Sequence, residues 1–358
     1  MKRFLKGALC FLPFVILIVG VNFYADPANV LRTGYERTVA EILAGGENAS
    51  NLRNMDDRLF MEEYVSLRKE PIGTLVLGSS HSMQITKELT GDENTFCAGM
   101  TGADLRDCIS AYRLFRENGF TPERVILVVD CWFLCEETQE PRAMTDGYEA
   151  FCKENGLMPV QTEAAQFSLK KLTQKWSQAV SLPYFQSSLD YLKKGLQNDR
   201  DPVATDSFYT DTDMRRADGT YCYNQELRNV QEDQTHDRAV NYIIATPEFA
   251  KNFTTVSANL ENQLIAFITS MQEDGVQVAL MLPPFHPEYY TYMTQTELYT
   301  KILMVEPVVQ QIAETCGVRL FGSFDPSKCG LSALDFYDGL HCSDQAMYRF
   351  YPENLFDF

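Results

Sequence analysis

Short apolar runs alternate with amphipathic stretches over much of this chain. The runs that are rich in branched residues span 72–77, 124–129, 276–282 and 318–321. Helical spacing of apolar residues covers 103–117, 258–271 and 299–315. Uninterrupted apolar strands are typical of parallel sheets, in which helices bury both faces. The alternation therefore predicts an α/β domain with a parallel sheet between helical layers.

The N-terminus carries a longer apolar run that follows positive charges. Lys2, Arg3 and Lys6 stand at its start, and Asn22 interrupts it near its end. A helix of roughly 17–25 residues can span a bilayer, and the charges predict that the N-terminus stays inside. We therefore predict a single-pass transmembrane anchor at 1–25, with the remaining chain outside the cytoplasmic membrane. A cleaved signal peptide and a buried helix are the alternatives.

The chain after this run divides into two parts that differ in composition and in apolar pattern. Residues 26–70 are polar and mixed, which predicts a membrane-proximal spacer with one or two helices. The α/β pattern occupies 71–358 but breaks down over 136–254. A structureless loop of that length is improbable, so we expect a mostly helical or irregular insertion that forms a subdomain or lid. One amphipathic helix within it is marked by Phe167, Leu172, Trp176 and Val180.

Composition and charge narrow the class of protein. The 358 residues are 45% hydrophobic, which supplies a full core and excludes a disordered chain. There are 31 basic and 49 acidic residues, a net charge of −18, so a phosphate backbone is repelled and we expect no nucleic-acid partner. The sequence has no zinc-type cysteine spacing, calcium loop or dinucleotide fingerprint. We therefore expect neither a metal nor an organic cofactor.

The ten cysteines do not indicate a disulfide scaffold in a chain this long. Nine of them follow the N-terminal run, so at least one is free or pairs with another chain. We expect most of them to be small buried hydrophobes, with one or two bridges at most.

The candidate chemistry lies where strands end, because sites in parallel sheets form at the carboxyl ends of the strands. Gly78 and Ser79 lead from the first strand into Ser80. A serine at such a turn exposes its hydroxyl, and free amides of the next helix can stabilise an oxyanion. Near the C-terminus, Asp338 precedes His341 by three residues. In that spacing the carboxylate can hold the imidazole Nδ1 and orient Nε2 toward a serine.

These two motifs resemble the first and last sequence blocks of the SGNH (GDSL-like) hydrolase superfamily. The resemblance covers about 71–135 and 256–350, close to half of the chain. It implies a three-layer α/β/α domain of flavodoxin-like type. It further implies that Ser80 is the nucleophile, His341 the general base and Asp338 its orienting partner.

The other two blocks of the superfamily match less completely. The second block supplies a glycine amide to the oxyanion hole, and here we favour Gly99 over Gly102, beside the amide of Ser80. The third block supplies an Asn side chain, but this strand ends in Asp130. An ionised Asp130 directed inward would repel an oxyanion, so either the hole has two donors or this residue serves another purpose. A missing donor costs about 2.7–4 kcal/mol of transition-state stabilisation.

Several further residues are candidates for the site. We predict substrate contacts from His286, Trp132 and Asp130, although loop and core roles are the alternatives for the first two. His81 is a rival base whose ring we expect to point away from the Ser80 hydroxyl. Ser79 and Ser82 are the alternative nucleophiles.

The residues and the resemblance together predict a membrane-anchored, extracytoplasmic serine esterase or O-acyltransferase. Superfamily members that lack the Asn block include the D-alanyl transfer protein of teichoic-acid modification and the alginate O-acetylation proteins. The resemblance thus implies an acetyl or D-alanyl group, a cell-envelope polymer or glycan, and a membrane-bound partner that supplies the acyl group. The alternatives are a decayed SGNH-fold scaffold and an unrelated α/β surface protein.

Overall fold

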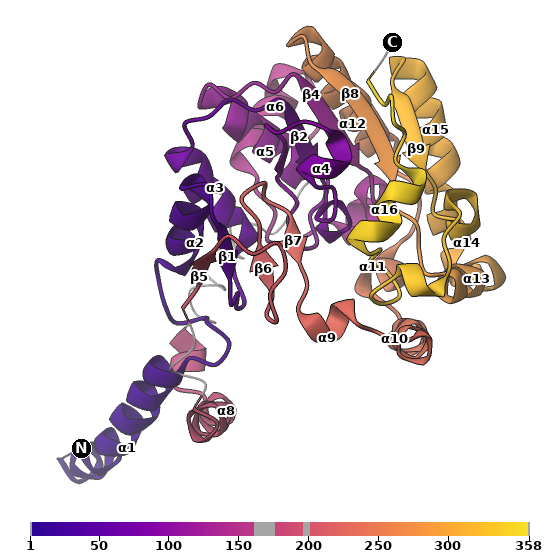
Figure 1. The fold of residues 1–358 in the computed structure, drawn as a ribbon. Coiled ribbons are helices and arrows are strands. Elements are labelled where there is room, and N and C mark those ends of the chain that lie inside the picture. The colour runs from indigo at the N-terminus through magenta and orange to yellow at the C-terminus, as the bar shows by residue number, and fades with distance from the viewer. Residues whose placement is uncertain (1, 161–175, 196–200, 357–358) are drawn as a thin grey trace.

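A five-stranded parallel sheet forms the centre of the protein. The computed structural model describes residues 2–160, 176–195 and 201–356. The strands are β2 (Thr74–Leu77), β3 (Phe96–Cys97), β4 (Arg124–Val128), β8 (Gln277–Leu282) and β9 (Arg319–Gly322). They lie in the order β3-β2-β4-β8-β9, and every pairing is parallel (Figure 1). The predicted α/β class and parallel sheet are confirmed, and β3 is an additional strand too short to show in the sequence pattern.

Both faces of this sheet are buried, and alternate residues of each strand point to opposite faces. One face carries Leu75, Leu77, Val125, Leu127, Val278 and Leu280. The other carries Val76, Ile126, Val128, Ala279 and Met281. Burying each such side chain contributes about 1.5–3 kcal/mol, which explains why these strands contain no polar alternation.

Helices cover the two faces unequally. The first face packs against α5 (Leu105–Glu117), α6 (Asp146–Glu154), α12 (Ala258–Glu273) and α15 (Val305–Cys316). The second face is covered by α4 (Lys87–Thr90) and α16 (Asp344–Phe350) (Figure 1). The helix predicted over 299–315 is two helices, α14 (Glu297–Leu303) and α15. Pro307 explains the break, because proline is favoured in the first turn of a helix and disfavoured inside one.

Residues 26–70 are part of the domain, which differs from the spacer that we predicted. They form α2 (Tyr35–Ala44), β1 (Asn48–Ser50) and α3 (Asp57–Leu67). Phe60, Met61 and Tyr64 of α3 are buried in the same core as the main sheet. The apolar patterns in this segment are short, so the sequence alone does not distinguish two packed helices from a solvated linker.

The insertion contributes strands as well as helices. Strands β5 (Val203–Thr205), β6 (Met214–Arg215) and β7 (Tyr221–Cys222) join β1 in an antiparallel sheet of order β5-β1-β6-β7. The expectation of a mostly helical or irregular insertion therefore holds only in part. In the described part of the insertion the helices are α6, which packs on the parallel sheet, α8 (Leu182–Lys193), α9 (Gln225–Arg228), α10 (Glu232–Ala245) and α11 (Glu248–Asn252). Phe167 and Leu172, which marked a predicted helix, lie outside the described residues.

Short elements connect these layers. After β8 the chain forms α13 (Pro287–Gln295). The 3-10 segments are η1 (Ser80–Ser82), η2 (Cys131–Leu134), η3 (Glu136–Thr138), η5 (Pro326–Cys329) and η6 (Ala333–Asp335). Two of them, η1 and η2, follow directly after neighbouring strands of the parallel sheet, so they lie at its carboxyl edge.

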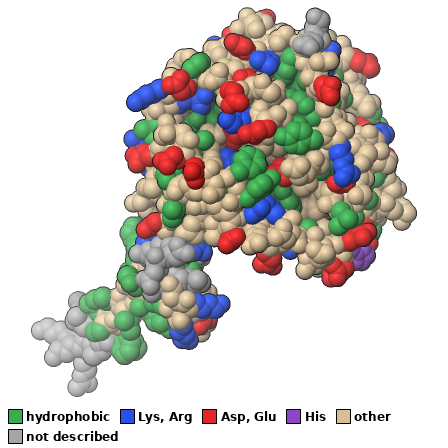
Figure 2. Space-filling model, viewed as in Figure 1, with side chains coloured by type: hydrophobic (Ala, Val, Ile, Leu, Met, Phe, Trp, Pro, Cys, Tyr) green, Lys and Arg blue, Asp and Glu red, His purple; other side chains and the backbone are tan. Residues whose placement is uncertain are grey.

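The N-terminal helix α1 (Lys2–Ala25) projects away from the body, with α8 beside its end (Figure 1). Asn22 is buried there, and its amide donates to the carbonyls of Ala179 and Ser181 at 3.0 and 3.3 Å. Figure 2 shows apolar side chains on the projecting part and charges of both signs over the body. The transmembrane helix expected at 1–25 is not found: within the described ranges, no helix combines the length and apolarity that a membrane span requires.

Candidate active site

The turn after β2 presents Ser80 at the carboxyl edge of the sheet. Gly78 has φ 154°, and a Cβ there would lie 2.8 Å from the Cβ of Val128, so the turn requires glycine. Ser79 caps η1, because its hydroxyl accepts the amide of His81 at 3.2 Å. Ser80 is the first residue of η1, and its hydroxyl faces the loop that follows β9.

The structure brings together the three residues that the sequence predicted as catalytic. Ser80 Oγ lies 2.9 Å from His341 Nε2. The other ring nitrogen, His341 Nδ1, lies 2.9 and 3.0 Å from the two carboxylate oxygens of Asp338. Asp338 Oδ1 also accepts the amides of Leu340 and His341 at 2.8 and 2.9 Å. The carboxylate thus fixes the tautomer in which Nε2 can accept the serine proton.

The electrostatic surroundings of Asp338 and His341 favour general-base chemistry. Burial acts to raise the pKa of Asp338, but the His341 ring and two amide donors hold it well below its ordinary value. Burial acts to lower the pKa of His341, but the negative charges of Asp338 and Asp130 raise it overall. Asp338 therefore stays ionised, and the positive charge that His341 gains on accepting a proton is stabilised.

The loop that carries Asp338 and His341 is held from two sides. The amide of His286 donates to the carbonyl of Gly339 at 3.2 Å. A Cβ at Gly339 would lie 2.9 Å from the ring of Tyr242, so α10 packs directly on this loop. Its rigidity comes from contacts with α10 and α13 as well as from its own turn.

Gly99 lies against the nucleophile turn, as expected for an oxyanion donor. A Cβ there would lie 2.4 Å from Ser82 Oγ and 2.9 Å from Met83 Cγ, so a larger residue does not fit. A Cβ at Gly102 would instead lie 3.1 Å from Glu140 Oε2. In the described part of the chain, the Ser80 amide donates to no backbone carbonyl, whereas the Gly99 amide donates to the Cys97 sulfur and acts to lower the pKa of that thiol. The Ser80 amide is therefore available for a developing negative charge, and the Gly99 amide would have to exchange the sulfur for the oxyanion.

A buried arginine of the insertion holds the loop that contains Gly99. Arg215 of β6 donates to the carbonyl of Gly99 at 2.7 Å and to Asp57 Oδ1 at 2.8 Å. It also donates to the carbonyl of Gly219 at 3.0 Å. Asp57 in turn accepts the amide of Thr101 at 2.8 Å. The insertion and α3 together thus position the second oxyanion donor.

Little in the sequence pattern indicates that the insertion supports the site. The passage around 199–218 is rich in aspartate, which is typical of a solvated loop. In the structure, Tyr221 of β7 donates its amide to the carbonyl of Met83 at 3.0 Å. Cys97 donates its amide to the carbonyl of Asp218 at 2.7 Å. Two adjacent arginines within an acidic passage, at 215 and 216, were the signal that could have indicated a buried pair.

A cavity of about 440 Å³ opens over Ser80 and His341. Its volume falls in the range of small-molecule sites, about 300–1,000 Å³. The insertion and the segment before α3 supply most of its walls. The lining residues are Leu52, Arg53, Asn54, Met55, Asp57, Ser80, Met83, Thr101, Asp213, Tyr221, Tyr223 and His341.

None of the three predicted substrate contacts lines this cavity. Trp132 is buried and donates its Nε1 proton to the carbonyl of Ala103 at 2.9 Å. Asp130 is fully buried, and its Oδ1 lies 2.5 Å from His81 Nδ1. The His81 ring is itself adjacent to that of His341, with 5.1 Å between ring centroids.

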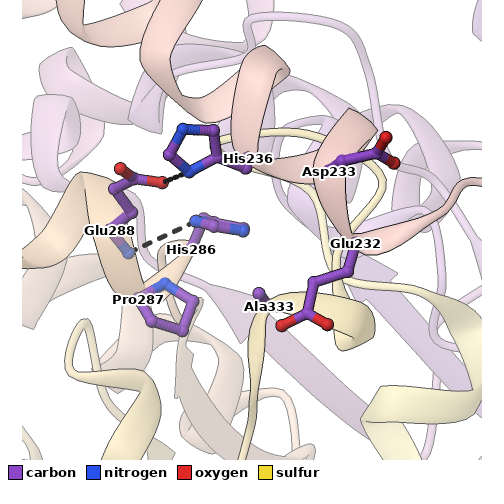
Figure 3. A pocket seen from close by; sticks show the side chains of 7 residues that line it. All are labelled: Glu232, Asp233, His236, His286, Pro287, Glu288 and Ala333. Carbon is purple, nitrogen blue, oxygen red and sulfur yellow. Dashed lines mark hydrogen bonds and ion pairs between the residues drawn. The ribbon is translucent and has the colours of Figure 1, made fainter.

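His286 belongs to a second cavity of about 680 Å³, which shares no lining residue with the first. Figure 3 shows His236 of α10 facing Glu288 of α13, with 2.6 Å between Nδ1 and Oε2. His286 Nδ1 accepts the amide of Glu288 at 3.3 Å, and burial lowers the pKa of His286 to about 4. In the structure this histidine is therefore a neutral helix cap.

The cysteines and the clusters of potential metal ligands are the remaining candidates for reactive chemistry. All nine described cysteines are thiols, and eight of them are buried. Burial raises the pKa of the Cys97 thiol to about 11, so it is not a ready nucleophile. Over the described ranges, no group of three or more His, Cys, Asp or Glu side chains could hold a metal ion. No family model matches this chain, and no curated protein matches its sequence.

Proposed function

We propose that this protein is a serine esterase or O-acyltransferase of SGNH type. The observation that carries the proposal is the continuous hydrogen-bond chain from Ser80 through His341 to Asp338. The free Ser80 amide, the Gly99 amide beside the nucleophile turn and the cavity above the serine supply the other groups that acyl transfer needs. The strand order of the parallel sheet, second-first-third-fourth-fifth along the chain, is that of flavodoxin-like domains and supports the fold assignment.

The reaction would proceed through an acyl-serine. Ser80 Oγ attacks the ester carbonyl carbon while His341 Nε2 takes the hydroxyl proton, and the carbonyl oxygen becomes an oxyanion bound by the amides of Ser80 and Gly99. The bond to the leaving alcohol then breaks, and His341 returns the proton to that alcohol. Water or an acceptor hydroxyl attacks the acyl-serine by the same steps in reverse, which gives hydrolysis or transfer.

The proposed substrate is an acetyl or D-alanyl ester of a cell-envelope polymer or glycan. The cavity over Ser80 has polar and aromatic walls, including Tyr221 and Tyr223, and it is too small to hold a polymer. A small acyl group would therefore enter while the polymer stays outside. The sequence of 1–25, apolar after three positive charges, supports placement at the outer side of a cytoplasmic membrane. A membrane-bound partner would supply the acyl group.

A fluorophosphonate probe tests the proposal because it phosphonylates only an activated serine. We expect the full-length protein in detergent to be labelled, and Ser80→Ala and His341→Ala to remain unlabelled. Ser66→Ala is the matched control, since this exposed serine of α3 bonds only to the carbonyl of Glu63. An unlabelled native protein, with a known serine esterase labelled in parallel, would reject catalysis and favour a scaffold that has lost activity.

A further inference from the structure

A second histidine–aspartate pair lies beside the catalytic one. His81 and Asp130 have exposed fractions of 3% and 0%, and Nδ1 and Oδ1 are 2.5 Å apart. Asp130 lies two residues after β4, directly before η2, at the position where the SGNH pattern has its Asn. The superfamily resemblance assigns no role to a carboxylate there, nor to a histidine directly after the nucleophile.

The hydrogen bonding of this pair shows how the two side chains are oriented. Asp130 Oδ1 accepts a hydrogen bond from His81 Nδ1–H, which leaves His81 Nε2 buried without a partner among the described residues. An imidazolium would place an unpartnered, charged N–H donor in that position, which is costlier than the lone pair of a neutral ring. Asp130 Oδ2 is likewise buried without a partner among the described residues, so the hydrogen bond from His81 is the contact that orients this carboxylate.

The His81–Asp130 pair lies close to His341, the base of the proposed triad. The rings of His81 and His341 are 5.1 Å apart between centroids, tilted by 55°. The groups beside His341 are Asp338 from its own loop, Asp130 from the turn after β4, His81 from η1, and Tyr223, whose ring centroid is 6.0 Å away. Burial and the charge of Asp338 raise the pKa of Tyr223 well above its ordinary value, so its hydroxyl is uncharged. Asp338 and Asp130 are thus the carboxylates whose charges raise the pKa of His341, and Arg53, Asp57 and Asp213 line the cavity that it faces.

We propose that Asp130, oriented by His81, is a second buried carboxylate that stabilises the positive charge His341 gains when it takes the serine proton. Both are positioning residues, since neither needs to touch the substrate. The inference rests on the proposed function of His341 as the base. The inference explains why this site lacks the Asn of the SGNH pattern. Asp130 stands in its place, so the site loses one oxyanion donor while His341 becomes a stronger base.

Histidine titration by NMR tests the electrostatic part without requiring turnover. The chain has only four histidines, so ring signals of histidine-labelled, full-length protein in detergent can be resolved, and His341→Gln identifies the signal. We expect Asp130→Asn to lower the titration midpoint of His341 by about one pH unit, because a nearby buried charge is lost. His81→Asn places an amide donor where Nδ1 stood and keeps the carboxylate charged, so the midpoint should move by less than half of that.

Two controls keep the interpretation specific. Glu288→Gln removes a carboxylate that faces the other cavity and should leave the His341 midpoint unchanged. Asp130→Ser removes the same charge and carries the test if the Asn variant does not fold. A midpoint that stays in place or rises when Asp130 loses its charge overturns the inference.

Labelling kinetics separate this inference from the proposed function. In the native protein the fluorophosphonate rate should rise with pH as His341 loses its proton. In Asp130→Asn the rise should begin about one unit lower and reach a plateau about tenfold slower. Absent labelling of the native protein rejects the proposed function, whatever the midpoints show. Normal labelling with an identical pH profile in both proteins rejects only the role of Asp130.

Discussion

Arg215 offers a sharp test of how the insertion supports the site. Its side chain is fully buried, donates to Asp57 and Gly99, and lies over the ring of Phe60 with 4.5 Å from Cζ to the centroid. Arg215→Met keeps the length and apolar contact but leaves the buried Asp57 carboxylate without its cation. Breaking a buried pair in this way costs about 3–5 kcal/mol. The amide of Thr101 still donates to Asp57, so we expect the lower end of that range.

Two measurements follow from this substitution. Chemical denaturation should show the loss of unfolding free energy. Fluorophosphonate labelling should slow by about tenfold, since the Gly99 amide is held less firmly but not removed, and complete loss of a donor costs about 10²–10³. Asp57→Asn combined with Arg215→Met should recover part of the stability, because no charge is then left unpaired.

Arg37→Met is the matched surface control. Its side chain is 44% exposed and pairs with Glu41 and Glu63 near the surface, so the loss of unfolding free energy should be small beside that of Arg215→Met and labelling should not change. If Arg215→Met is as stable and as reactive as the native protein, then neither the buried pair nor the insertion positions the oxyanion loop.

Three further predictions test the site and its support. Labelling should fall at low pH with a midpoint above the ordinary histidine value of about 6.5, because the pKa of His341 is raised and only its neutral form is a base; a midpoint clearly below that value contradicts the geometry. Asp338→Asn should slow labelling by about 10⁴, as in other triads that lose the correct tautomer, and circular dichroism should show an intact fold. Asn22→Leu removes the amide that α1 donates to the carbonyls before α8, so limited proteolysis should cut faster near 176–195; an unchanged cleavage rate would show that this contact does not hold the insertion.

The parallel sheet could be predicted from the sequence because its physical signal is local. Runs such as 124–129 are apolar without alternation, since both faces of the strand are buried, and that pattern is visible within six residues. The two-residue strand β3 carries no such signal, because it is held in place by its neighbour and by the backbone of the insertion. The helix predicted over 299–315 is divided because Pro307 lies in the first turn of α15. The spacing of apolar residues does not include this effect of proline.

The candidate site shows the same division between local and distant information. Ser80 and His341 are 261 positions apart, yet each stands in a short motif with its own local geometry, so both could be named in advance. The cavity walls could not, because Tyr221 and Tyr223 reach the site from an insertion whose sequence is typical of a solvated loop. His286 and Trp132 were placed near the site by strand ends alone, which fix the edge of the sheet but not the direction of a side chain.

The sequence by itself determined the elements of the sheet, the nucleophile turn and the Asp–His loop, because short-range sterics and apolar patterning specify them. Only the tertiary structure decided what lies between these parts. It showed that Asp130 meets His81, that Arg215 meets both Asp57 and Gly99, and that residues 26–70 pack into the core. Such pairings join positions 49 to 158 residues apart. Their energy comes from burying complementary charges together, and one-dimensional spacing carries no record of which charges meet.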